Sequence, residues 1–187
     1  MVTQLVYSQL REFTATLGGQ FVQVVTKPGF ARWDQITPAS VLLAEVSEIK
    51  YKPGDSPKDI LVLGSGHGAL GASLAKNHDV RKIWVADTTL TALSMADRTL
   101  RKNGIYNAYI LTDPQELDIL EECFDAIFIE LPKGRRLIRR WLVEARRALR
   151  PGGILYLAGA NSEGIQPAIK DAHALFGNAA ILGYKKG

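Results

Sequence analysis

The sequence predicts an α/β fold in which a doubly wound, mostly parallel sheet carries helices on both faces. Short apolar runs of strand length alternate with segments whose apolar residues recur at helical spacing. A glycine-rich turn joins one such strand to a helix, as in ligand-binding α/β folds. The 187 residues, 47% of them hydrophobic and 22% charged, fit one folded domain. We expect a single domain over residues 1–187, with a lead-in of residues 1–57 and a core of residues 58–187.

The lead-in is expected to contain a helix, a strand and a second helix. Residues 1–17 alternate only weakly between polar and apolar types and are interpreted as a helix, which a glycine pair ends. Residues 21–25 are strongly apolar and β-branched, so they favour a strand. Thr37, followed by a proline, has the form of an N-cap before a first-turn proline. A helix should therefore begin there and end near Lys50.

The core is expected to hold strands and helices in alternation, which predicts parallel pairing of the strands. The expected strands are Asp59–Leu63, Lys82–Ala86, Tyr109–Leu111, Phe124–Ile129 and Gly153–Ala158. The expected helices between them are Ala69–Lys76, Thr91–Asn103 and Leu137–Leu149. Residues 165–176 indicate a further helix and residues 179–184 a sixth strand.

A glycine-rich loop, Gly64-Ser65-Gly66-His67-Gly68, follows the first core strand. Its glycines place bare backbone at the carboxyl ends of the strands, where ligands bind in open α/β sheets. The same glycines also serve a tight turn, and with Gly71 they satisfy a dinucleotide-binding pattern. The loop is thus a candidate cofactor site whose ligand depends on the residues around it.

Two acidic residues after neighbouring strands favour an adenosine ligand. Asp87 ends the second core strand, where its carboxylate can accept hydrogen bonds from both hydroxyls of a ribose. The alternative is an N-cap for the helix that follows. Asp113 follows the third strand, where it either accepts from the exocyclic amine of an adenine or begins a turn. With Thr88, these residues complete the candidate cofactor-binding set.

Four segments, in order, resemble the class I S-adenosylmethionine-dependent methyltransferases. They are Ile60–Gly68, Trp84–Asp87 with the helix leading to Asn103-Gly104, Phe124–Ile129 and Leu149–Leu155. A nicotinamide-dependent oxidoreductase explains the glycines and Asp87 equally well, but it leaves the Leu-Arg-Pro-Gly-Gly run without a role. The resemblance implies a Rossmann-like sheet, S-adenosylmethionine as cofactor, and methyl transfer in which the protein mainly positions donor and acceptor.

Within that family, Pro28–Asp34 resembles the lead-in of ribosomal RNA guanine-N2 methyltransferases and their small-domain relatives. Those enzymes carry Asn-Pro-Pro-Phe after the fourth strand, where this chain has Glu-Leu-Pro-Lys at residues 130–133. A glutamate can accept a hydrogen bond from an amine and take up a proton, but it lacks the donor of the amide. The runner-up hypothesis is therefore a non-catalytic cofactor- or RNA-binding module. The resemblance makes Glu130 and Pro132 candidate catalytic residues, and Trp33 and Leu131 candidate substrate contacts.

Two further departures from the family concern the cofactor and the sheet. Many members place an acid two residues before the first glycine to hold the methionine amino group, whereas this chain has Val62. That task would shift to Glu130, Asp34 or backbone carbonyls. His67 is expected to line the cofactor cleft rather than to act as a base. The family's seventh, antiparallel strand has no counterpart here, so either the sheet is short by one strand or the sequence lacks its natural end.

The distribution of basic residues suggests RNA as a partner. Arginines gather between Arg135 and Arg150, in a chain whose net charge is +4. They either contact RNA phosphates, with Arg136 and Arg140 as candidate contacts, or form the solvated face of a helix. The single cysteine offers no metal-ligand spacing, and the apolar runs are too short to cross a bilayer. We therefore expect a cytoplasmic protein without a metal site.

Overall fold

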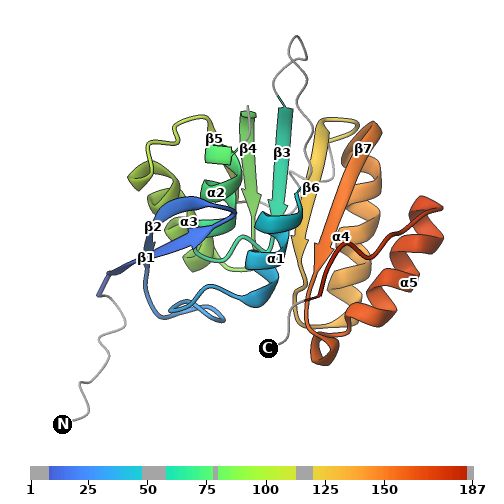
Figure 1. Cartoon of the computed structure of the whole chain (residues 1–187), viewed down its shortest axis with the longest axis horizontal. Helices are drawn as coiled ribbons and strands as arrows, with labels where there is room; N and C mark the ends of the chain where they lie inside the picture. Colours follow the sequence, from blue (N-terminus) through green and yellow to red (C-terminus); the bar gives the residue numbers. More distant parts are fainter. Residues whose placement is uncertain (1–8, 48–57, 78–79, 113–119, 185–187) are drawn as a thin grey trace.

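The computed structural model describes residues 9–47, 58–77, 80–112 and 120–184, and these form a parallel sheet, flanking helices and a hairpin (Figure 1). The strand order is β5-β4-β3-β6-β7, and each pair is parallel. The doubly wound parallel sheet predicted from the sequence is confirmed. The strands are β3 (Lys58–Leu63), β4 (Val80–Ala86), β5 (Ala108–Leu111), β6 (Phe124–Glu130) and β7 (Leu149–Ala158).

Helices cover both faces of this sheet (Figure 1). The helices are α1 (Pro38–Val46), α2 (Ala69–Asn77), α3 (Leu90–Lys102), α4 (Arg135–Ala148) and α5 (Ile165–Phe176), with a short 3₁₀ turn η2 (Asn161–Glu163). One apolar cluster joins one sheet face to α1, α2, α3 and the β-hairpin of residues 11–26, and a second joins the other face to α4 and α5. Strands buried on both sides appear in the sequence as nearly continuous apolar runs, which is why the core strands could be recognised there.

The helix predicted for residues 1–17 is wrong over the described part. Residues 11–17 form strand β1 (Arg11–Leu17), which pairs antiparallel with β2 (Gln20–Thr26). Gly18 and Gly19 supply the two-residue turn, and both have positive φ, the conformation that tight hairpins require. The hairpin also makes contacts with residues far away in the sequence, which the sequence does not reveal. Thr99 of α3, for example, exchanges two hydrogen bonds of 3.0 and 3.1 Å with the backbone of Val25.

The strand predicted for residues 179–184 is also wrong, because these residues make no strand pairing within the described chain. The segment instead runs back from α5 toward α1 (Figure 1). A Cβ added at Gly183 would lie 3.5 and 3.6 Å from the side chains of Val46 and Leu42. Other differences are shifts of boundaries: α1 ends at Val46, and β7 begins at Leu149, directly after α4.

Candidate functional site

The glycine loop lies at the carboxyl edge of the sheet, between β3 and α2, and its backbone is held by the neighbouring strand. The amides of Gly64 and Ser65 donate to the carbonyl of Ala86 at 3.0 and 3.2 Å. Two of its glycines are required by close packing: a Cβ on Gly64 or Gly68 would lie 2.7 Å from the backbone of Glu130 or Ala96. The loop is thus a fixed part of the core rather than a free segment.

Gly66 differs from the other two glycines of the loop. A Cβ there would meet a single described neighbour, Phe30 Cε2 at 3.9 Å. Its φ of +52° lies in the left-handed region that favours glycine. Beside it, the Ser65 hydroxyl is buried and has no hydrogen-bond partner among the described residues. Gly66 with an open side and, in the adjacent residue, a buried polar atom without a partner are features of a candidate ligand-binding turn, since buried polar atoms ordinarily have a partner.

Asp87 organises this loop from the end of β4. Its Oδ2 accepts from the amide of Gly66 at 2.9 Å, and its Oδ1 accepts from the amide of Thr89 at 3.2 Å. The N-cap of α3 is Thr89, whose hydroxyl accepts from the amide of Ala92. The alternative in which Asp87 is the cap is therefore wrong. Thr88 is exposed beside the carboxylate, with its hydroxyl 3.4 Å from Oδ1.

His67 turns away from the solvent and joins the loop to the lead-in segment. The residue is 6% exposed, and its ring lies edge-on to Phe13 of β1 and to Phe30. Nε2 is 3.0 Å from the carbonyl of Gln35, so this nitrogen carries the proton and Nδ1 keeps its lone pair. Burial lowers the pKa of His67 below its ordinary value, although the Gln35 hydrogen bond and the charge of Glu130 act in the opposite direction. The imidazole is therefore neutral at neutral pH.

Glu130 lies at the end of β6 with its side chain 12% exposed and its carboxylate held from two sides. Oε1 accepts from Arg32 at 2.9 Å, and Oε2 accepts from the hydroxyl of Ser40 in the first turn of α1 at 2.6 Å. Arg32 also forms an ion pair with Glu163 of η2. A carboxylate has about four acceptor positions, so this one remains able to accept further hydrogen bonds.

The other residues predicted for the site have surroundings that differ from those of Glu130. Leu131 is 3% exposed and belongs to the apolar cluster beneath α4, so its side chain is not presented to a substrate. Pro132 is half-buried directly after it. Trp33 is half-buried beside the hairpin, with the guanidinium of Arg11 5.2 Å from the ring centroid. Asp113 lies outside the described residues.

The arginines between Arg135 and Arg150 do not form one surface. Arg139 donates to Asp171 of α5 at 2.9 and 3.2 Å, and Arg135 lies 3.8 Å from the same carboxylate. The hydrogen bond from Arg139 lowers the pKa of Asp171. Arg140 pairs with Glu144 one turn along its own helix.

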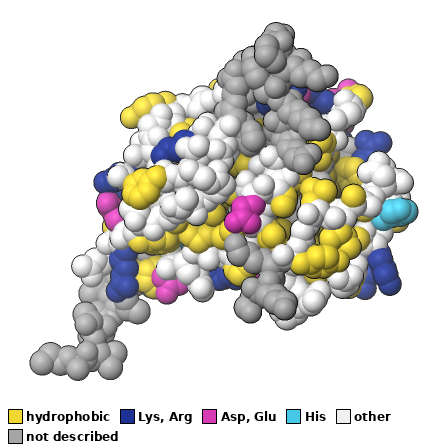
Figure 2. Space-filling view, viewed as in Figure 1, with side chains coloured by type: hydrophobic (Ala, Val, Ile, Leu, Met, Phe, Trp, Pro, Cys, Tyr) yellow, Lys and Arg dark blue, Asp and Glu magenta, His cyan; other side chains and the backbone are white. Residues whose placement is uncertain are grey.

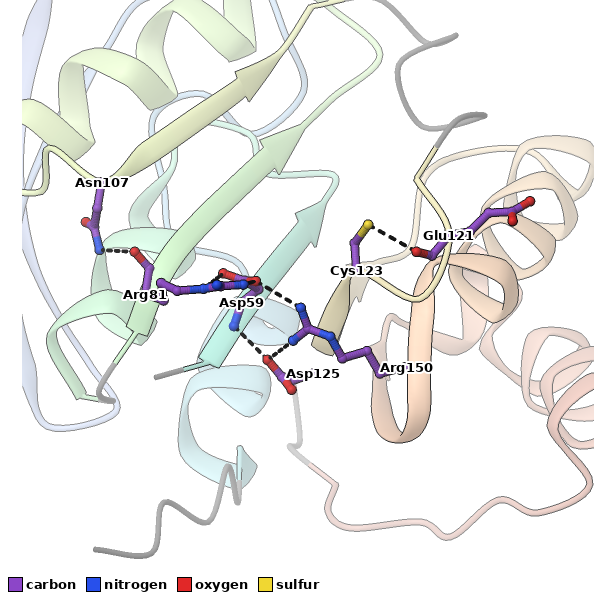
Figure 3. Close-up of polar contacts among 7 residues, drawn as sticks. All are labelled: Asp59, Arg81, Asn107, Glu121, Cys123, Asp125 and Arg150. Atoms are coloured by element: carbon purple, nitrogen blue, oxygen red, sulfur yellow. Dashed lines mark hydrogen bonds and ion pairs between the residues drawn. The ribbon is translucent and has the colours of Figure 1, made fainter. Parts of the chain in front are cut away.

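Arg150 lies at the opposite edge of the sheet, beyond the end of α4. It donates to Asp125 at 2.7 Å and to Asp59 at 3.2 Å, and Arg81 also contacts Asp59 (Figure 3). This amino-edge cluster, Asp59, Arg81, Asp125 and Arg150, joins four strands of the sheet. Arg150 therefore has a structural partner and is not a free cation.

Arg136 and Arg146 are exposed, and neither forms an ion pair within the described chain. The face that carries α1 and the hairpin shows only scattered Lys and Arg side chains (Figure 2). Within the segment from Arg135 to Arg150, Arg136 and Arg146 therefore remain available to a polyanion.

Sequence reasoning missed three residues that complete the site: Arg32, Ser40 and Glu163. Arg32 lies within the Pro28–Asp34 stretch that was singled out, but a pairing across 98 residues leaves no local signal. Among the described residues no cluster suited to a metal ion occurs. No helix in the described ranges is long and apolar enough to cross a membrane.

A comparison with protein families matches the model of the methyltransferase small domain over residues 21–187. The chain belongs to this family. Its sequence is 30% identical over 146 residues to the ribosomal RNA small subunit methyltransferase C of Hahella chejuensis, covering 73% of this chain and 40% of that protein. It is 25% identical over 131 residues to the Bacillus subtilis protein YbxB, covering 68% of this chain and 65% of that one.

The structure resembles that of the T. thermophilus 16S rRNA N2 methyltransferase RsmC, solved in complex with AdoMet and guanosine. The TM-score is 0.74 at 26% identity, over 91% of this chain and 46% of RsmC. M. jannaschii TYW2, at 14% identity and a TM-score of 0.61, shares the fold. The predicted family is confirmed. The chain spans less than two thirds of the length of the curated relatives it matches.

Proposed function

We propose that this chain is an S-adenosylmethionine-dependent methyltransferase whose cofactor lies against the loop Gly64–Gly68 and Asp87. The observation that carries the proposal is the open side of Gly66, next to the unpartnered hydroxyl of Ser65. The family, and the AdoMet in the RsmC structure, support the choice of cofactor.

The residues present fit such a cofactor. Asp87 already accepts two backbone hydrogen bonds, but carboxylate oxygens have further lone pairs for the hydroxyls of a ribose. Ser65 offers a buried donor and acceptor in the loop itself. Val62, in the place of the family's acid, is fully buried, and its side chain has no polar atom to offer. The methionine amino group would therefore be held by backbone carbonyls or by Glu130, which carries a negative charge at the same edge.

Glu130 is the residue of this chain best placed to contact a methyl acceptor. S-adenosylmethionine supplies an activated methyl group, so the protein has mainly to align the acceptor and keep water away. The carboxylate of Glu130 can accept a hydrogen bond from an amine and take up the proton that the amine loses on methylation. Pro132, two residues after Glu130, restricts the backbone conformations open to this segment.

RNA is the acceptor we propose, with an amino group of a guanine base as the target. Both RsmC relatives act on ribosomal RNA, and the T. thermophilus structure contains guanosine. Arg136 lies in the first turn of α4, close in sequence to Glu130, and is exposed with no ion pair to any described residue, so it can meet a phosphate. Arg146 is ten residues further, about 15 Å along the helix axis, so it would contact a more distant part of the RNA. A cytoplasmic location is expected for such an enzyme.

Methyl transfer to ribosomal RNA fragments tests this proposal, with labelled S-adenosylmethionine as donor. The protein should label a guanine amino group, and affinity for RNA should fall steeply with salt because bound phosphates release counterions. Arg136→Gln should flatten the salt dependence, whereas Arg139→Gln, whose arginine is paired with Asp171, should change it less. No labelling of RNA, together with equal salt slopes for all three proteins, would contradict an RNA acceptor.

A second function is a binding module that keeps the cofactor fold without methyl transfer. It is favoured by the loss of the Asn-Pro-Pro-Phe motif and by the ion pair that engages Glu130. Cofactor binding without transfer to any RNA, protein or small-molecule pool would identify this case.

A further inference from the structure

Arg32 adopts an unusual backbone conformation at the carboxyl edge of the sheet. Its φ is +57°, in the left-handed region, which non-glycine residues other than Asn and Asp rarely occupy. Residues are held in such conformations only where the surroundings determine them, and they gather at functional sites. The loop of residues 27–37, called the lead-in loop below, therefore bends so that the Arg32 guanidinium reaches two carboxylates.

The contacts of Arg32 join three segments that are distant in the sequence. One nitrogen donates to Glu130 at 2.9 Å, and another pairs with Glu163 of η2. The second oxygen of Glu163 accepts from the amide of Ala160 at 2.9 Å, so this partner is itself fixed. On its other side, Glu130 accepts from Ser40, whose position is set by the N-cap Thr37.

The charges of this cluster show what Arg32 does for Glu130. Two carboxylates and one guanidinium meet, with Glu130 12%, Glu163 16% and Arg32 29% exposed. Without the guanidinium the two carboxylates would repel each other in a partly desolvated place, and each would turn toward water. Ser40 alone would then hold Glu130 by a single hydrogen bond.

We propose that Arg32 is a positioning residue for the acceptor end of the site: it fixes the Glu130 carboxylate and ties the lead-in loop to Glu163. This inference rests on the proposed methyl transfer, because Glu130 is the group that contacts the acceptor amine. It assigns to the lead-in loop the task of holding the Glu130 side chain by an ion pair.

The test compares Arg32→Gln, Arg32→Lys and Glu163→Gln with Arg101→Gln, whose exposed pair with Asp97 lies on α3. In transfer assays we expect Arg32→Gln to lower kcat by about 10-fold to 100-fold, because a misplacement of about 1 Å can cost about 100-fold. The affinity for S-adenosylhomocysteine should fall less than kcat, because Asp87 and the backbone of the glycine loop, which make the other proposed cofactor contacts, are not held by Arg32. Arg32→Lys should recover part of kcat because it keeps the charge, and Arg101→Gln should resemble the parent.

Hydrogen exchange of residues 27–37 supplies a readout that needs no acceptor. Arg32→Gln and Glu163→Gln should speed exchange there, and Arg101→Gln should not. A parent protein that methylates no acceptor would contradict the proposed function, and the exchange data would then decide the role of Arg32 alone. Parent-like kcat in Arg32→Gln, a loss of cofactor affinity equal to the loss of kcat, or unchanged exchange in Arg32→Gln would each overturn the inference.

Discussion

The two edges of the sheet differ in whether all their polar groups have hydrogen-bond partners. At the amino edge, the cluster of Asp59, Arg81, Asp125 and Arg150 pairs every carboxylate with a guanidinium (Figure 3). At the carboxyl edge, the Ser65 hydroxyl and the Nδ1 atom of His67 are buried with no partner among the described residues.

The amino edge of the sheet thus contributes to stability, and the carboxyl edge is suited to binding a ligand. Buried polar groups are ordinarily satisfied, so the paired amino edge leaves no buried polar atom for a ligand to satisfy. An edge with unsatisfied buried atoms, a glycine loop and a carboxylate with spare acceptor positions can bind one. In open α/β sheets, ligands do bind beyond the carboxyl ends of the strands.

The largest effect on stability should come from replacing a glycine of the loop that is closely packed, Gly68, and it should exceed the effect of replacing Gly66, whose side is open. Gly68→Ala would place a Cβ 2.7 Å from Ala96 Cα at a φ of +81°. We expect it to lower the free energy of unfolding by about 2 to 5 kcal/mol, from overpacking together with the left-handed backbone. Gly66→Ala has only the backbone cost of about 1 to 2 kcal/mol, because its side is open.

Urea unfolding measures both variants, and S-adenosylhomocysteine titration shows whether the open side of Gly66 is where the ligand approaches. A folded Gly66→Val protein should fail to bind, because its branched side chain occupies that space. Normal ligand binding by Gly66→Val, or equal stability of the two alanine variants, would remove the distinction between the glycines.

A smaller effect should come from the amino edge, where Asp59→Asn leaves Arg81 and Arg150 without their shared charge partner. We expect a loss of about 2 kcal/mol of unfolding free energy, less than for a fully buried pair because both guanidiniums are partly exposed. The affinity for S-adenosylhomocysteine should not change. A tenfold loss of affinity without loss of stability would mean that the amino edge also takes part in binding.

The pH dependence of stability should report on His67 at the carboxyl edge. Because burial lowers its pKa in the folded state, the unfolded chain binds the proton more readily. Stability is therefore complete above the unfolded pKa of about 6.5 and falls as the pH drops through that value toward the folded pKa. The slope from one such group is at most about 1.4 kcal/mol per pH unit.

Thermal unfolding between pH 8 and pH 5 can be compared for the parent and His67→Gln. The parent should lose stability more steeply on acidification than the variant. Identical pH profiles would show that the imidazole is not buried in its neutral form.

The elements that could be predicted from the sequence are those whose signal is local. The strand before Gly64 is a continuous apolar run, and Thr37 with its proline marks the start of α1, where the Thr37 hydroxyl caps the amide of Ser40. Strand β1 was missed because its alternation is weak and because the contacts that hold the β1–β2 hairpin come from distant residues of α2 and α3. Residues 179–184 have the composition of a strand, but no described strand pairs with them.

The site follows the same division. The loop and Asp87 meet as predicted, because consecutive parallel strands end at the same edge. The hold on Glu130 could not be predicted, since Arg32 and Ser40 are 98 and 90 residues away from it. The arginine segment could not be resolved either, because the charge pattern does not reveal that Asp171 and Asp125 pair with its members.

Calorimetric titration with S-adenosylhomocysteine tests most directly whether the carboxyl edge is the cofactor site. The parent protein should bind with a dissociation constant near the micromolar range, about 8 kcal/mol of binding free energy. Asp87→Ala should remain folded and bind about 10- to 100-fold more weakly, because hydrogen bonds to a charged acceptor contribute about 1.5 to 3 kcal/mol. No heat from the parent, or equal affinity of a folded Asp87→Ala protein, would contradict the assignment of this edge to the cofactor.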